Sequence, residues 1–122
     1  MVLEAPGSLA RVRAECRNGK ADRITVRNFP SFAGEMGVSL DVPGLGPLTV
    51  DTAFGDNSFV VVDAASLGFE LVASEVKTLA DLGVAITNAA NAQLTFSHPT
   101  NPDWKHFSIC LLRDQSPANA TI

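Results

Sequence analysis

Two stretches of the sequence carry residue types that could hold a small ligand. Gly55-Asp56-Asn57-Ser58 is a polar, turn-prone tetrapeptide that interrupts a run of β-forming residues, and Trp104-Lys105-His106 opens another apolar segment. Carboxylate, amide and imidazole groups at the mouths of buried strands are hydrogen-bonding groups on rigid supports, which suits a binding pocket. The pattern at Gly55-Asp56-Asn57-Ser58 fits a plain reverse turn equally well. For His106 the pattern alone favours a structural histidine at a strand end, with its hydrogen bonds made within the fold.

The remaining reactive residue types give no catalytic pair. His98 precedes a proline and is expected on the surface or in a turn, while Gly44-Leu45-Gly46 is too short for a phosphate loop and lacks a following helix. Cys16 and Cys110 have no metal-ligand spacing, and both sit in apolar strand patterns, so we expect free buried thiols. Aspartates that flank strands are expected to be solvated or turn-capping: Asp41, Asp51 and Asp63.

Composition narrows the class of protein. The 122 residues suit one domain, with 9 basic against 13 acidic residues and a net charge of −4. Because no basic cluster exists, nucleic acid and anionic membrane surfaces are poor partners. The first residues lack a signal-peptide pattern, and no apolar run approaches the ~20 residues that span a bilayer. We therefore expect a cytoplasmic protein.

The clearest local structure is a hairpin near the N-terminus. Residues 8–16 and 20–28 alternate in polarity, with Ala10, Val12, Ala14 and Cys16 on one side, which is typical of a half-buried strand. Between them lies Asn18-Gly19, the dipeptide best suited to a type I′ turn. Short strands are also predicted at 38–42, 48–51, 59–62 and 107–112.

One helix is predicted, over about 75–94, with Ser74 as its N-cap. Apolar residues recur at helical spacing and alanines widen the apolar arc around the helix. A helix this apolar is expected to be embraced by sheet. The pattern predicts an α+β domain in which a curled, mainly antiparallel sheet wraps around one central helix.

Three stretches together resemble the proline racemase family. They are APGSLARVRAECRNGKADRITVRNFPSF, DVPGLGPLTVDTAFGDNSFVVVDA and HPTNPDWKHFSIC, in matching order, and the likeness runs from about Leu3 to Leu112. The family includes proline racemase, 4-hydroxyproline 2-epimerase and trans-3-hydroxyproline dehydratase. The resemblance implies a fold like that of diaminopimelate epimerase, in which two similar lobes, each a curled sheet around a helix, enclose the substrate.

The resemblance also implies a mechanism without a cofactor. Two cysteine side chains on opposite faces of the α-carbon take and return its proton. Their motifs, a Cys-Gly-His type and Asp-Arg-Ser-Pro-Cys-Gly-Thr-Gly, are both absent here, so no catalytic residue is assigned and the chain alone is expected to be inactive. The loosely similar segment 114–119 lies too close to His106 and is taken as coincidence. We expect residues 1–112 to be most of one lobe and 113–122 a loose tail.

Two parts of the binding site carry over from the family. His106 matches a substrate-contacting histidine, and Gly55-Asp56-Asn57 matches a Gly-Gly-Asn segment at the cleft, with Asp56 in place of the second glycine. His106, Asp56 and Asn57 are therefore the expected substrate-binding residues, on one rim that faces the missing second lobe. The expected ligand is proline or a hydroxyproline, no metal is expected, and a homodimer is possible. The alternatives are a lobe of the dehydratase or a non-catalytic single-lobe binding or assembly module.

Overall fold

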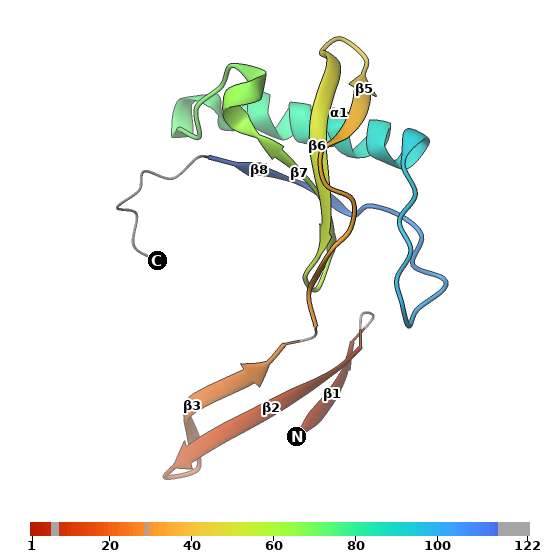
Figure 1. Ribbon diagram of the computed structural model, residues 1–122. Coiled ribbons are helices and arrows are strands. Elements are labelled where there is room, and N and C mark those ends of the chain that lie inside the picture. The colour runs from red at the N-terminus through yellow and green to blue at the C-terminus, as the bar shows by residue number, and fades with distance from the viewer. Residues whose placement is uncertain (6–7, 29, 115–122) are drawn as a thin grey trace.

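The computed structural model describes residues 1–5, 8–28 and 30–114. Figure 1 shows two bodies joined by the segment around residue 30: a three-stranded N-terminal sheet, and a five-stranded sheet packed against one helix. No helix among the described residues has the length and apolar composition needed to cross a membrane.

The N-terminal sheet contains the predicted hairpin. β1 (Val2–Ala5), β2 (Ser8–Arg17) and β3 (Lys20–Arg27) pair antiparallel in the order β1-β2-β3. Asn18 and Gly19 both have positive φ angles, 52° and 77°, as a two-residue type I′ turn requires. The sequence signal was local and strong, and the hairpin forms where it was predicted.

Burial of this hairpin was predicted wrongly. Ala10 is buried, but Cys16 is exposed, and Ile24 and Val26 on β3 are 61% and 56% exposed. Alternation shows that one face is apolar, but it does not supply the second layer that would cover that face. In the part of the chain that the structure describes, no element is layered on it (Figure 1), so Cys16 is a surface thiol.

The second sheet forms the body of the molecule. Its strands β4 (Phe32–Ala33), β6 (Gly46–Phe54), β7 (Ser58–Asp63) and β8 (Ile109–Arg113) lie side by side in that order, and β5 (Val38–Val42) pairs with β6. Every pairing is antiparallel except β7 with β8, which is parallel from Phe59↔Ile109 to Asp63↔Arg113. The sheet is mainly antiparallel, as predicted.

The helix α1 (Val76–Gln93) begins later than its sequence suggests. It follows two 3₁₀ turns, η1 (Ala64–Leu67) and η2 (Ala73–Glu75), and its N-cap is Glu75. Ser74 lies inside η2 and is not the N-cap, which corrects the prediction. The Glu75 carboxylate instead accepts a hydrogen bond from the Glu70 N–H at 3.1 Å, so its side chain closes the preceding loop.

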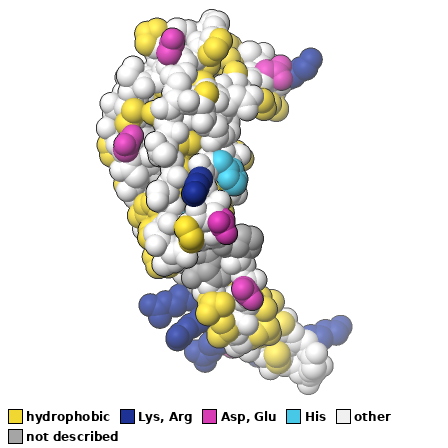
Figure 2. All heavy atoms as spheres, turned by 90° about the vertical axis from the view of Figure 1, so that its right-hand side faces the viewer, with side chains coloured by type: hydrophobic (Ala, Val, Ile, Leu, Met, Phe, Trp, Pro, Cys, Tyr) yellow, Lys and Arg dark blue, Asp and Glu magenta, His cyan; other side chains and the backbone are white. Residues whose placement is uncertain are grey.

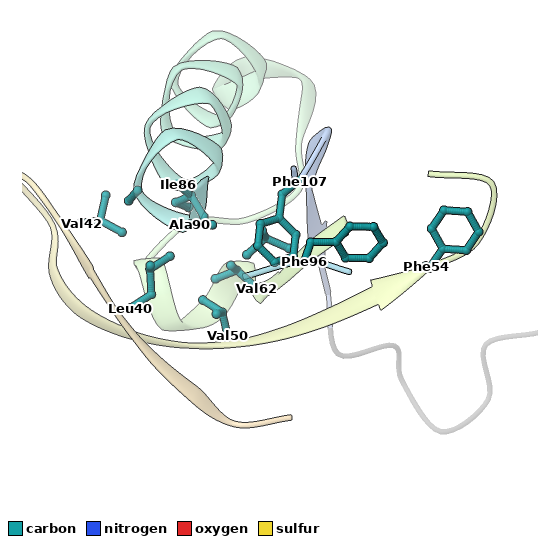
Figure 3. Packing of buried hydrophobic residues seen from close by; sticks show 11 residues of the cluster. Leu40, Val42, Val50, Phe54, Val62, Ile86, Ala90, Phe96 and Phe107 are labelled. Carbon is teal, nitrogen blue, oxygen red and sulfur yellow. The ribbon is translucent and has the colours of Figure 1, made fainter. Parts of the chain in front are cut away.

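One face of α1 packs into the core. Figure 3 shows Ile86 and Ala90 directed toward Val42, Val62 and Phe107. Leu79, Ile86, Ala89 and Ala90 are buried, but Val76 and Val84 on other sides are 60% and 62% exposed. The sheet therefore packs against the inner side of the helix, and Val76 and Val84 remain on its exposed side.

The end of the described chain is tied to the sheet. Arg113, which the prediction assigned to the tail, closes β8, and its Nε lies 2.7 Å from Asp63 Oδ1. Its Nη2 also lies 3.7 Å from Asp51 Oδ2, so two of the strand-flanking aspartates are ion-paired. Residues 115–122, which include most of the predicted tail and of the segment 114–119, lie outside the described residues.

Candidate functional site

The polar tetrapeptide is a tight hairpin connection. Phe54 on β6 pairs with Ser58 on β7, so the loop consists of Gly55, Asp56 and Asn57. The Gly55 N–H donates to the Asn57 carbonyl at 3.0 Å, and Asp56 has φ of 68°. That angle favours glycine, and aspartate is among the few other residues that tolerate it. The side chains of Asp56 and Asn57 are exposed.

His106 lies on the surface against the chain's single tryptophan. The rings of Trp104 and His106 stack with centroids 6.2 Å apart and planes 19° apart. His106 itself is exposed and Trp104 is half-buried, so the indole covers one side of the imidazole while another side faces solvent. Histidine atoms reach the surface in Figure 2, on a face that also carries lysine or arginine and acidic groups.

A single hydroxyl joins the turn to the histidine loop. Ser58, the residue after Asn57, is fully buried, and its Oγ donates to the carbonyl of His106 at 2.7 Å. The same Oγ accepts from Trp104 Nε1 and from the Ser108 N–H, each at 3.0 Å. The start of β7 and the loop before β8 therefore lie side by side. This contact brings the predicted residues at 56, 57 and 106 to one end of the sheet.

His98 is buried, which corrects its predicted surface position. It is 8% exposed, its ring also stacks on Trp104 with centroids 5.8 Å apart, and Phe54 meets it edge-on at 4.7 Å. Its Nδ1 accepts the backbone N–H groups of Thr100 and Asn101, at 3.2 and 2.9 Å. Because Nδ1 is an acceptor, the neutral ring carries its proton on Nε2. His98 is a turn residue whose ring completes an aromatic stack.

The helix α1 also holds the loop that precedes β8. Asn91 of α1 donates through Nδ2 to the Phe107 carbonyl at 2.9 Å, and its Oδ1 accepts the Phe107 N–H at 2.7 Å. Phe107 is buried in the core. The side-chain amide of Asn91 therefore fixes the backbone next to His106. This support does not involve Ser58.

The groups with shifted pKa values lie outside this end of the sheet. The hydrogen bond from Arg113 holds the pKa of the Asp63 carboxyl below its ordinary value. Burial raises the pKa of the Cys110 thiol to about 11, because the thiolate is the charged form. Cys110 lines a groove of about 630 Å³ between α1 and β8, whose lining does not include Asp56, Asn57 or His106. Among the described residues, no three potential ligands cluster as a metal ion requires.

Sequence reasoning missed the residues that connect the site. Ser58 stood in the quoted tetrapeptide but carried no assigned role, and Trp104 was named only as a neighbour of His106. The available signal was a hydroxyl at the first position of an otherwise apolar strand. A buried polar group needs partners, so such a residue indicates a contact from elsewhere in the chain. Which residues supply that contact depends on the pairing of β7 with β8.

Comparison with known proteins identifies relatives of the whole described chain. The family model described as proline racemase matches residues 1–121. A probable proline racemase from Agrobacterium radiobacter K84, solved with bound carbonate, is 26% identical with a TM-score of 0.81, covering 93% of this chain and 33% of that one. A hydroxyproline epimerase from Agrobacterium vitis, solved with bound trans-4-hydroxy-L-proline, is 26% identical with a TM-score of 0.82, covering 95% and 34%. The chain thus spans about a third of the length of these structures, and the likeness confirms the predicted α+β fold class.

Proposed function

The chain belongs to the proline racemase family, and we propose that it supplies one wall of the substrate cleft in an enzyme that racemises or epimerises proline or a hydroxyproline. The observation that supports this proposal is the contact between Ser58 and the backbone of His106. It brings an imidazole beside a turn that carries a carboxylate and an amide. An imino acid presents a carboxylate and an ammonium group at its α-carbon, and these three side chains suit both.

The roles of the side chains follow from their charges. The imidazole of His106 and the amide of Asn57 donate hydrogen bonds to the substrate carboxylate, and the Asp56 carboxylate faces the ammonium. All three are exposed at the end of a rigid sheet, where a second wall can close over a ligand. Closure would remove water and strengthen each of these contacts.

The proton transfer itself requires thiols that this chain does not position. In the two-cysteine mechanism that the family resemblance implies, the base that removes the α-proton is a thiolate, yet burial raises the pKa of Cys110 to about 11, which favours the protonated thiol at neutral pH. Cys16 lies in the other sheet, on β2. We infer that both catalytic cysteines and the opposite wall come from the other two-thirds of a protein as long as the solved relatives.

The test uses deuterium exchange at the α-carbon. The coding sequence on both sides of this chain is read to its start and stop, and the encoded protein is expressed. In D₂O, the longer protein is expected to exchange the α-proton of L-proline or trans-4-hydroxy-L-proline, as followed by proton NMR. The 122-residue chain alone is expected to give no exchange.

Three outcomes separate the proposal from its alternatives. Formation of a dehydrated product from trans-3-hydroxyproline identifies the dehydratase. A coding sequence that adds nothing to the chain supports the non-catalytic module. Exchange by the 122-residue chain that survives replacement of both Cys16 and Cys110 by serine contradicts the thiol mechanism.

A further inference from the structure

The hydrogen bonds of the Ser58 hydroxyl use all of its donor and acceptor positions and join the start of β7 to the loop before β8. A serine hydroxyl has one donor and two acceptor positions. The proton goes to the His106 carbonyl, and the lone pairs accept from Trp104 Nε1 and from the Ser108 N–H. Ser108 Oγ is also 3.1 Å away. Among the described residues, no buried side-chain nitrogen or oxygen lacks a partner, so this network is complete.

Two of these bonds help to hold His106, one directly and one through Trp104. One fixes its backbone carbonyl, and the other fixes the indole on which its ring is stacked, with centroids 6.2 Å apart. The same indole also stacks with His98, whose ring is itself held by two backbone N–H groups. The rings of His98 and Trp104 are therefore held by hydrogen bonds, and His106 is the exposed ring of the three.

We propose that Ser58 is a positioning residue that holds the His106 imidazole, through Trp104 and the His106 carbonyl, in fixed register with the Asp56-Asn57 turn. Ser58 follows Asn57 directly, so one residue sets the distance between the two halves of the binding wall. The ligand class is a small zwitterionic imino acid, and in this respect the inference rests on the proposed function. Ser58 is fully buried and does not touch the ligand.

The variants separate positioning from general stability. Ser58→Ala removes the hydroxyl, while Ser58→Cys keeps a group of similar shape that hydrogen-bonds weakly. Asn91 and the β7–β8 pairing still hold the neighbouring backbone, so the fold is expected to persist. Ser66→Ala is the matched control, because Ser66 Oγ donates to the Asp63 carbonyl at 2.6 Å beyond the other end of β7.

The first measurement needs no ligand. Trp104 is the only tryptophan, so its indole N–H gives a single side-chain signal in a ¹H–¹⁵N spectrum of the 122-residue chain. In Ser58→Ala, and in Ser58→Cys if the alanine variant does not fold, this N–H is expected to exchange with solvent roughly tenfold faster than in the parent. The ring-proton shifts of His106 are expected to move as well. The proposal is overturned if a folded Ser58 variant shows the same indole exchange rate and the same His106 ring shifts as the parent. Ser66→Ala should match the parent in both.

The second measurement adds trans-4-hydroxy-L-proline to the longer protein of the deuterium-exchange test. Loss of a hydrogen-bonded support is expected to raise KM roughly tenfold in Ser58→Ala with a smaller change in kcat, and to leave Ser66→Ala unchanged. Equal KM for parent and Ser58→Ala overturns the proposal. If the parent neither binds nor turns over the imino acid, the proposed function fails, and the indole and His106 signals still decide whether Ser58 positions the histidine.

Discussion

Replacing Ile86 by alanine should make the five-stranded sheet and its helix unfold at a much lower concentration of denaturant. Ile86 is fully buried in the core on the inner face of α1. The change removes three carbon atoms, which at about 0.8 kcal/mol each corresponds to about 2.5 kcal/mol of lost transfer free energy. The cavity left behind adds about 1 kcal/mol, and the better helix propensity of alanine returns a few tenths. We expect the free energy of unfolding to fall by about 3 kcal/mol.

Val84→Ala is the matched control. Val84 lies on the same helix but is 62% exposed, so its replacement is expected to change stability by less than about 0.5 kcal/mol. Urea unfolding followed by far-ultraviolet circular dichroism of the helix measures both variants, and the loss at Ile86 should lower the midpoint by roughly 1.5–2 M. If Ile86→Ala does not fold, Ile86→Val should still cost about 1 kcal/mol. A cost below 1 kcal/mol for Ile86→Ala, or equal costs at positions 86 and 84, refutes the packing argument.

Four further predictions follow from local chemistry. Iodoacetamide at pH 8 should alkylate exposed Cys16 at least tenfold faster than Cys110, whose pKa is raised to about 11 by burial, and peptide mass spectrometry giving equal rates would contradict this. The same pKa shift predicts how the free energy of unfolding depends on pH. The contribution of Cys110 should be fully present below about pH 9 and should fall toward pH 11, because the thiol ionises at lower pH in the unfolded chain than in the folded one. Cys110→Ser should flatten that decline. Arg113→Ala should raise the pKa of the Asp63 carboxyl toward its ordinary value, as measured by NMR titration, and an unchanged pKa would argue against the ion pair. In the parent, the stability that the pair contributes is present above the ordinary pKa of the carboxyl and should be lost as the pH falls through the lowered one. Asp56→Gly should leave thermal stability unchanged or raise it, whereas Asp56→Val should lower it by about 1–2 kcal/mol because φ is 68°, and equal melting temperatures would exclude strain at this turn.

The local parts of the fold were predictable from sequence, since their signals act over a few residues. Asn18-Gly19 specifies its own turn geometry, and residues 38–42 form β5 within the predicted bounds. The start of α1 was misplaced because η2 competes with the helix for the same residues, and Ser74 suits both. At such boundaries, nearly equal local preferences are decided by packing.

Burial and contacts between distant segments were not predictable in the same way. The alternation of polar and apolar residues in β2 and β3 resembles that in β6. The N-terminal hairpin is nevertheless open on its apolar face, whereas the apolar face of β6 lies in the core against α1. Nothing within a strand specifies which layer covers it. His98 illustrates the same limit, because its burial depends on Phe54 and Trp104, which lie 44 positions before it and 6 after it. The proximity of His106 to the 55–57 turn was expected from the family resemblance, whereas Ser58, which joins them, was not.

The parallel pairing of β7 with β8 has a consequence for the order of events during synthesis. Phe59 pairs with Ile109, so β7 must wait for about fifty more residues before its second neighbour exists. At about 5–20 residues per second on the ribosome, that interval is roughly 2.5–10 s. During this interval, β7 has an unpaired strand edge and carries valines that are buried in the finished fold. Ser58 also lacks its partners at positions 104 and 106. The proposed binding wall would therefore be completed only once β8 has been synthesised, and a nascent chain halted before residue 109 is expected to be the form most prone to pair with other chains.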